Sequence, residues 1–238
     1  MSATRKLLLP LALTLAIAAC SKPADTAAPA ADAAAPATTE QAATPAADAA
    51  AAAPADEAIK IASGTYKLDP SHTDVLAQWS HFGFSNPSAH FGNVEGTLVY
   101  NAEDVTKSTV EVKLPLSGLN SFTAKFDEHL KSADFFDAAK FADATFKSTK
   151  VEAAGTNKLT VTGDLTIKGI TKPVTLALEL NGFGPDAYGG TRAGFSAKTE
   201  ISRKEYGVDI DMPMDGGGVV VGDKISIELE IEAVLRTA

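Results

Sequence analysis

Strict alternation between apolar and polar residues runs through much of this chain and constrains its fold more than any other feature. From Ile225 to Leu235 every second residue is apolar, and serine or glutamate occupies most positions between them. Thr109–Leu116 and Val174–Leu180 alternate in the same way. Successive side chains of a β-strand point to opposite faces, so this period of two indicates strands with one face in a core and one in water. The sequence therefore predicts an all-β, mostly antiparallel structure.

About nine segments between residues 61 and 238 fit a strand pattern. The remaining candidates are Thr65–Pro70, Asp74–Phe84, Ala89–Tyr100, Ala144–Ala153, Lys158–Ile167 and Thr191–Ser202. Short runs rich in glycine, proline, asparagine and serine separate many of them, as expected for hairpin turns. Only Ser121–Ala139 departs from the alternation, and the spacing of Phe122, Phe126 and Leu130 suits short helical turns. We predict a roughly eight-stranded antiparallel barrel with one helical insertion, because closure leaves no exposed sheet edge.

The N-terminal residues predict export. Two basic residues precede the apolar run Leu7–Ala18, which is shorter than the about 20 residues that a membrane-spanning helix needs. Ile17-Ala18-Ala19-Cys20 ends this run and resembles a bacterial lipobox, in which the cysteine is acylated and becomes the new N-terminus. We expect residues 1–20 to be a lipoprotein signal peptide and Cys20 to be the site of lipid attachment. The alternative is cleavage nearby by ordinary signal peptidase, with Cys20 incidental.

Alanine and proline dominate residues 21–60, which contain almost no large apolar side chain. Proline interrupts every stretch long enough to nucleate a helix, so we expect a disordered linker here and a single folded domain over residues 61–238. Ser21, in place of an aspartate, resembles lipoproteins sent to the outer membrane. The expected location is the bacterial cell envelope, with the domain facing the periplasm and its lipid anchor in the outer membrane.

Charge and cysteine content exclude several classes of partner. The formal net charge is −9, which argues against nucleic acid and against docking on anionic lipid headgroups. Contact with a membrane is therefore expected through Cys20. Because Cys20 is the only cysteine, no intrachain disulfide can stabilise the domain. A homodimer is neither indicated nor excluded by the sequence.

Aromatic residues gather around the predicted helical insertion. The interior of an eight-stranded barrel is either filled by side chains or holds one ligand. A single phenylalanine is typical of an ordinary core, whereas a cluster of this size favours a cavity. We expect the ligand cavity to be lined by Trp79, Phe82, Phe84, Phe91, Phe122, Phe126, Phe135, Phe136 and Phe146.

Several motifs are similar, in order and spacing, to those of one known family. They are Tyr66–Thr73, His81–Gly96, Asp127–Asp137, Gly163–Val174, Ile201–Gly207 and Val221–Ile225. Together they resemble the YceI family of polyisoprenoid-binding proteins, which have a lipocalin-like barrel. The resemblance implies an amphiphilic ligand, such as an isoprenoid quinone or polyprenyl lipid, with its apolar tail inside the barrel. We place Lys125, Asp127 and His129 near the mouth, in contact with the ligand's headgroup.

Two positions depart from the family pattern. Lys125 stands near where the family often has an arginine, so it keeps the charge but loses the planar fork of donors. Ala77 occupies a position where an aromatic residue is common, and the smaller side chain widens the predicted cavity.

The sequence offers little for metal binding or catalysis. His72, His81, His90 and His129 include no closely spaced pair that would begin a zinc or copper site, so no metal and no cofactor is expected. A Gly-x-Ser-x-Gly elbow and a phosphate-binding glycine loop are both missing. The first hypothesis is therefore a non-enzymatic, membrane-tethered lipid-binding protein. The alternatives are a hydrolase or isomerase that uses Asp127 and His129 on such a lipid, and an interaction module whose barrel is filled by side chains.

Overall fold

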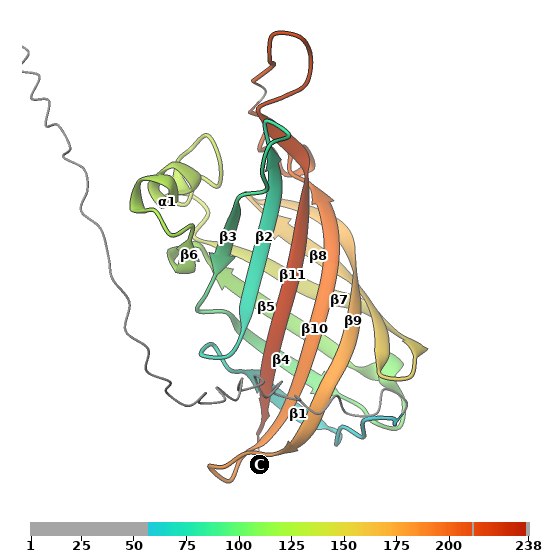
Figure 1. The fold of residues 1–238 in the computed structure, drawn as a ribbon. Coiled ribbons are helices and arrows are strands. Elements are labelled where there is room, and N and C mark those ends of the chain that lie inside the picture. The colour runs from blue at the N-terminus through green and yellow to red at the C-terminus, as the bar shows by residue number, and fades with distance from the viewer. Residues whose placement is uncertain (1–56, 211, 237–238) are drawn as a thin grey trace, which may run out of the picture. The chain divides into compact units, whose positions relative to one another are not determined.

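The chain folds into a closed antiparallel barrel with a short helix beside one end, as the computed structural model shows (Figure 1). The structure describes residues 57–210 and 212–236, so the predicted signal peptide and nearly all of the predicted linker lie outside the described residues. The strands are β1 (Gly64–Leu68), β2 (Asp74–His81), β3 (Ser88–Phe91), β4 (Glu95–Tyr100), β5 (Thr109–Pro115), β6 (Leu119–Asn120), β7 (Asp143–Gly155), β8 (Lys158–Ile167), β9 (Ile170–Pro185), β10 (Thr191–Ser202) and β11 (Val221–Leu235).

Helical structure is sparse among the described residues. The helix α1 spans Ala124–Lys131, and the 3-10 turns η1, η2 and η3 span Val105–Lys107, Leu116–Gly118 and Lys204–Tyr206. The predicted helical insertion is thus confirmed. None of the described helices combines the length and the apolar character needed to cross a membrane.

Pairing between β1 and β11 closes the sheet into a ring in the order β1-β4-β5-β7-β8-β9-β10-β11. Strand β2 continues along the same edge of β11, because Leu68 of β1 pairs with Ala233 and Asp74 of β2 pairs with Glu230. Likewise β3 pairs with β2 while β4 pairs with β1. Strand β6 in turn pairs with β3 while β5 pairs with β4. The barrel therefore has eight antiparallel positions, three of which are interrupted strands, and the predicted fold class is confirmed.

The interruptions are where the predicted strands and the structure differ. We predicted one strand over Ala89–Tyr100, but the chain breaks between β3 and β4 at Asn93, whose φ of 57° is incompatible with a strand. The predicted strand Asp74–Phe84 ends at His81, because Phe82 and Gly83 both have positive φ and turn the chain. Strand β6 was not predicted, since two residues are too few to show alternation.

One end of the barrel is filled by side chains. Tyr66, Tyr100, Leu180, Ala193 and Phe195 are buried there in one cluster. Ala233, near the C-terminal end of β11, belongs to the same cluster. The hydroxyl of Tyr66 donates a hydrogen bond to the carbonyl oxygen of Ala62 at 2.7 Å, so this polar atom is satisfied although the residue is fully buried. Any internal cavity must therefore lie in the remainder of the interior.

The other end is bordered by α1, which is attached through a few apolar residues. Leu130 is the buried residue of the helix and packs in a cluster with Phe91, Leu119 and Phe135. The start of the helix is held by Asp127, whose Oδ1 accepts hydrogen bonds from the backbone amide of Ser121 at 2.6 Å and from its hydroxyl at 2.5 Å. These contacts fix α1 beside β3 and β6 (Figure 1).

Candidate functional site

A cavity of about 520 Å³ occupies the barrel interior beyond the filled end. The inward row of β11 shows the division: Ile225, Ile227, Leu229 and Ile231 line the cavity, whereas Ala233 and Leu235 belong to the filled cluster. Other aliphatic lining residues are Val110, Val112 and Leu114 of β5, Val161, Leu165 and Ile167 of β8, and Val174, Leu176 and Leu178 of β9. Alternation along each strand therefore supplies the wall of the cavity.

The partial exposure of inward-facing residues shows that side chains do not fill this space. Leu114, Leu176 and Ile227 line the cavity, yet each is only partly buried in a closed barrel. The volume of about 520 Å³ also exceeds the roughly 300 Å³ at which sites for drug-sized ligands begin. Both observations argue against the filled-barrel alternative.

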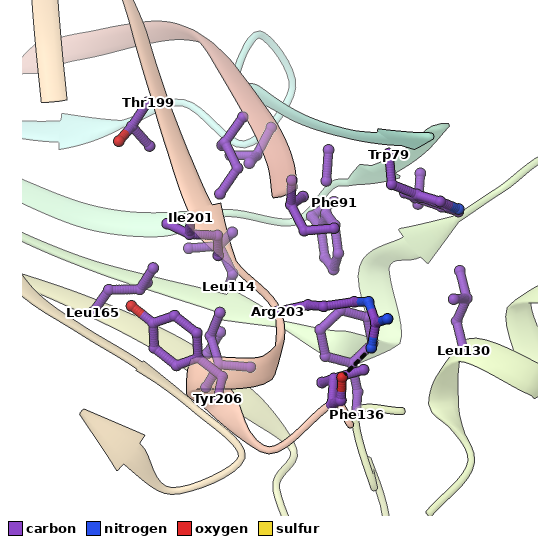
Figure 2. A pocket seen from close by; sticks show the side chains of 18 of the residues that line it. Trp79, Phe91, Leu114, Leu130, Phe136, Leu165, Thr199, Ile201, Arg203 and Tyr206 are labelled. Atoms are coloured by element: carbon purple, nitrogen blue, oxygen red, sulfur yellow. Dashed lines mark hydrogen bonds between the residues drawn. The ribbon is translucent and has the colours of Figure 1, made fainter. Parts of the chain in front are cut away.

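Six of the nine aromatic residues predicted to line the cavity do so. They are Trp79, Phe91, Phe126, Phe135, Phe136 and Phe146. Figure 2 shows Trp79, Phe91 and Phe136 among the lining side chains. Phe91 and Phe136 meet edge to face with their centroids 5.8 Å apart, and the rings of Trp79 and Phe126 lie 6.0 Å apart. Such pairs favour a fixed arrangement of the aromatic wall. Ligand contact by these residues stays a prediction.

Phe82, Phe84 and Phe122 do not line the cavity, and here the structure corrects the sequence analysis. Their exposures are 37%, 90% and 74%. Phe82 and Phe84 lie in the turn after β2, and Phe122 follows β6 with a φ of 63° and packs on the ring of His90. In a strand, every second side chain points into the barrel, but this rule does not extend to residues in turns. Aromatic character alone therefore did not predict whether these three side chains point into the cavity.

Of the three predicted headgroup contacts, only His129 lines the cavity. Its ring packs against Phe135 with centroids 4.6 Å apart. Lys125 lies on the same helix but is exposed and outside the lining, and the carboxylate of Asp127 is engaged with Ser121. Asp127 lies two positions from each of the other two and so faces a different side of the helix. Lys125 and His129, four positions apart, share a side of the helix, but only His129 reaches the lining of the cavity.

The mouth of the cavity is identified by the lining residues that are also exposed to solvent. These are Ser85 in the turn after β2, His129 on α1 and Met212 in the segment before β11. The cavity therefore opens between these three elements, at the end of the barrel away from the filled cluster. Most of the remaining lining is apolar, so polar recognition is concentrated at few positions.

Two buried polar residues of the lining, Arg203 and Tyr206, were not predicted as site residues. Arg203, which is 6% exposed, donates hydrogen bonds from Nε to Gly222 at 2.9 Å, from Nη2 to Val221 at 3.0 Å and from Nη1 to Val208, in each case to the carbonyl oxygen. It thus joins the segment after β10 to the start of β11. The inward row of β10, continued one step beyond Ile201, would have placed Arg203 toward the interior.

Tyr206 differs from the other buried tyrosines. It is 1% exposed, and its hydroxyl is the one buried side-chain polar atom among the described residues that lacks a hydrogen-bond partner. Burial raises the pKa of this hydroxyl, and nearby Glu205 raises it further, so the group is neutral at physiological pH. In Figure 2 the ring of Tyr206 lies beside Leu165.

One cluster has the residue types of a metal site, although none was expected. Ligand atoms of Asp69, His72 and Glu232 lie within 4.8 Å of one another, and no second such group occurs in the described part of the chain. The guanidinium of Arg192 already bonds Asp69 at 2.5 Å and Glu232 at 2.9 Å, and its Nε bonds Asp186 at 2.9 Å. Hydrogen bonds from Arg192, then from His72, hold the pKa of Asp69 well below its usual range. This cluster is an ion-pair network.

The residues of the hydrolase or isomerase alternative are engaged separately. Asp127 accepts hydrogen bonds from Ser121, while the ring of His129 packs against Phe126 and Phe135. The hydroxyl of Ser132 donates to the carbonyl oxygen of His129 at 2.7 Å. The hydrogen bonds found within residues 57–236 include none between Asp127 and His129, so this structure contains no assembled acid–base pair there.

A closed antiparallel barrel with an apolar internal cavity and a mouth at one end defines a class: the small barrels that can enclose a single ligand. The comparison with known proteins identifies the family within this class. A profile described as a YceI-like domain matches residues 66–233, and the chain belongs to this family. The resemblance noted from the sequence motifs is confirmed.

Curated relatives agree with this assignment, and solved structures share the fold. A UPF0312 protein of Vibrio parahaemolyticus is 39% identical over 166 residues, covering 70% of this chain and 84% of the relative. A YceI protein of Campylobacter jejuni has a TM-score of 0.57 at 26% identity, covering 66% of this chain and 90% of that one. BcnA of Burkholderia cenocepacia has a TM-score of 0.61 at 20% identity, covering 69% and 98%. A polyisoprenoid binding domain from Saccharophagus degradans has a TM-score of 0.56 at 13% identity, covering 72% and 98%.

Proposed function

We propose that this protein binds an amphiphile with a long apolar chain, such as an isoprenoid quinone or a polyprenyl lipid, inside its barrel. The observation that carries the proposal is the apolar cavity of about 520 Å³. Burial of apolar surface contributes about 25 cal/mol per Å², so about 300 Å² of buried ligand chain would contribute roughly 7 kcal/mol before the entropic cost of binding. Membership of the YceI-like family and the described ligand class of the Saccharophagus domain support this choice.

The distribution of polar groups gives the ligand an orientation. The wall of the cavity, which includes Leu114 and Leu178, consists mainly of aliphatic and aromatic side chains, whereas Ser85 and His129 lie at the mouth. An apolar tail would enter first, and the headgroup would remain near Ser85 and His129, because desolvating a polar group without a partner costs several kcal/mol. Of the headgroup residues expected from the sequence, His129 is the one this orientation retains.

We further propose that the protein carries its ligand without changing it chemically. The separate engagement of Asp127 and His129 supports this role over the hydrolase or isomerase alternative. Turnover assays on the wild type and on His129→Ala separate the two. A carrier releases the ligand unchanged from both proteins, whereas a product formed by the wild type and absent from His129→Ala would contradict the carrier role.

A lipid on Cys20 would hold the carrier at its source of ligand. The lipobox-like Ile17-Ala18-Ala19-Cys20 supports a periplasm-facing lipoprotein of the cell envelope, anchored in the outer membrane. Metabolic labelling with a radioactive fatty acid tests this. The wild type should incorporate the label and sediment with outer membranes, and Cys20→Ser should do neither. Labelling of Cys20→Ser to the same extent would contradict attachment at this residue.

Trp79 provides a direct assay for ligand binding. It is the only tryptophan of the chain and lines the cavity, so a bound quinone should quench its fluorescence. Delipidated full-length protein is titrated with an isoprenoid quinone and with the same quinone ring lacking its tail. Only the tailed quinone should quench saturably. The control places the tryptophan outside the cavity, as Trp79→Phe with Tyr188→Trp, where quenching should disappear. Equal quenching of both reporters, or none of Trp79, would contradict the proposal.

A further inference from the structure

We propose that exposed apolar side chains beside the mouth insert into the interface of a lipid bilayer, so that the ligand passes between bilayer and cavity without crossing water. This inference rests on the proposed function, because it assigns the route by which that ligand enters. We define the apolar rim as Phe82, Phe84, Met212 and Val219, whose exposures are 37%, 90%, 43% and 40%.

The rim is one continuous surface built from two chain segments. The backbone amide of Phe82 donates a hydrogen bond to the carbonyl oxygen of Val220 at 2.8 Å. The backbone amide of Val220 donates one to the carbonyl oxygen of Met212 at 2.9 Å. The rings of Phe82 and Phe84 are stacked with centroids 6.2 Å apart. Ser85 and Met212 also line the cavity, so the rim borders its mouth. The turn after β2 and the segment before β11 lie at the same end of the barrel in Figure 1.

The turn itself does not require phenylalanine. Phe82 and Gly83 have φ values of 54° and 70°, and the amide of Phe84 donates to the carbonyl oxygen of His81 at 3.0 Å. Two successive residues with positive φ suit asparagine and glycine, whereas a bulky aromatic residue is disfavoured in the first position. Phe84 makes little contact with the protein core, because 90% of the residue is exposed. The fold therefore gains little from the side chain of Phe84, whereas Phe82 also packs on the ring of His81, with the centroids 4.5 Å apart.

The chemistry of the rim and of the cavity identifies a lipid surface as the partner. A ligand with a long apolar chain enters an apolar cavity most readily from an apolar phase, and the rim lies where that transfer would occur. Residues 82–87 and 212–220 carry one charged side chain, Asp215, and the chain as a whole carries a net charge of −9. Binding of the rim to the bilayer is therefore driven by insertion of aromatic and aliphatic side chains, and not by attraction to anionic headgroups.

The length of the chain permits this orientation. The described residues begin near the filled end, since Ile61 packs in the cluster with Tyr66 and Phe195. A strand the length of β9, 16 residues, spans roughly 50 Å at about 3.3 Å per residue. The residues between Cys20 and Glu57 can reach at most roughly 120 Å by the same spacing. A lipid on Cys20 and a rim in the same bilayer are thus geometrically compatible.

A matched pair of tryptophan reporters tests insertion in the full-length protein. Both variants carry Trp79→Phe; one adds Phe84→Trp on the rim and the other adds Tyr188→Trp, at a residue that is 93% exposed in the turn between β9 and β10. The protein is reconstituted in neutral phosphatidylcholine vesicles with and without brominated lipid. We expect the Phe84→Trp emission to shift to the blue and to be quenched several-fold more than that of Tyr188→Trp. Equal quenching of the two reporters would overturn the proposal.

Transfer kinetics test the function of the rim and separate it from the binding proposal. Phe84→Ser and Phe82→Asn should each slow uptake of the quinone from vesicles about tenfold, which corresponds to about 1.4 kcal/mol, while binding from detergent micelles stays unchanged. Phe84 is 90% exposed, so the unfolding midpoint of Phe84→Ser should not fall, and a transfer defect in this variant is not a folding defect. Asparagine suits the positive φ of residue 82, and the unfolding midpoint of Phe82→Asn is measured beside its transfer rate. Tyr188→Ser is the control and should transfer at the wild-type rate.

Two outcomes distinguish failure of the binding proposal from failure of the rim proposal. Wild-type protein that takes no quinone from micelles contradicts the proposed function itself. Wild-type protein that binds from micelles, with variants that extract from vesicles at the wild-type rate, overturns the rim alone. If the rim instead joins two copies of the chain, the wild type should be a dimer that Phe84→Ser disrupts, and brominated lipid should not quench the Phe84→Trp reporter. This result would also overturn insertion.

Discussion

The unpartnered hydroxyl of Tyr206 allows a prediction whose sign is opposite to that of most core substitutions. Tyr206→Phe removes one buried oxygen and keeps the ring, which is 1% exposed. Tyr66 is a matched control, because it is equally buried but its hydroxyl donates to the carbonyl oxygen of Ala62 at 2.7 Å. The same chemical change should therefore stabilise the protein at one position and destabilise it at the other.

The magnitude follows from the cost of burying a polar group without a partner, about 1–3 kcal/mol. Because the ring of Tyr206 stays in place, Tyr206→Phe should raise the free energy of unfolding by about 1–2 kcal/mol and Tm by about 4 °C for a domain of this size. Tyr66→Phe removes a hydrogen bond and leaves the carbonyl oxygen of Ala62 without this donor. It should therefore lower the free energy of unfolding by about 1 kcal/mol.

Urea denaturation of delipidated protein, followed by circular dichroism, measures both changes. The urea dependence of the free energy should be the same in all three proteins, so that the midpoints alone report stability. A loss of stability in Tyr206→Phe comparable to that in Tyr66→Phe would refute the reasoning, since it would mean that the Tyr206 hydroxyl has a hydrogen-bond partner in solution.

Three further predictions concern the cavity, the ion-pair network and the packing of one strand. Ala77→Phe should fill part of the cavity, raising the free energy of unfolding by about 1–2 kcal/mol while weakening quinone binding roughly tenfold; stabilisation with unchanged affinity in the Trp79 titration would place the ligand elsewhere. Asp69→Asn should lower the free energy of unfolding at neutral pH by about 1–2 kcal/mol. Since the pKa of Asp69 is lowered in the folded state, its contribution is present above its unfolded pKa of about 3.9 and is lost as the pH falls below that value; acid titrations of wild type and Asp69→Asn that remain parallel would contradict this. Gly163→Ala should destabilise by about 2 kcal/mol or more, because a Cβ there would lie 2.4 Å from the ring of Phe146 and 2.5 Å from the carbonyl oxygen of Lys147; a thermal melt like that of the wild type would show that this contact is relieved at no cost.

Much of the fold was predictable because strand alternation is a local property. The rows of β9 and β11 were visible in the sequence, and the same rows form the aliphatic wall of the cavity. The break at Asn93 was not visible, because a single residue with positive φ leaves no mark in the alternation around it. Closure was inferred from the number of strands and the need to protect their edges.

The candidate site was predictable only in part, because aromatic character does not give direction. Phe91 and Phe146 lie on strands, and their inward positions follow from the period of two. Phe82 and Phe84 lie in a turn, and the conformation of that turn directs them away from the cavity. Whether the inward residues would fill the barrel depends on its circumference, which no local pattern determines. Arg203 was missed although the row of β10 leads to it.

Binding of an amphiphile inside the barrel is tested most directly by the mass of the molecule that co-purifies with the protein. The full-length protein is extracted from its own membranes in mild detergent and examined by native mass spectrometry, alongside Ala77→Phe. We expect one bound amphiphile with a long apolar chain on the wild type, released intact on activation, and reduced occupancy of Ala77→Phe. Wild-type protein that is consistently empty, or equal occupancy of both proteins, would contradict binding inside the barrel.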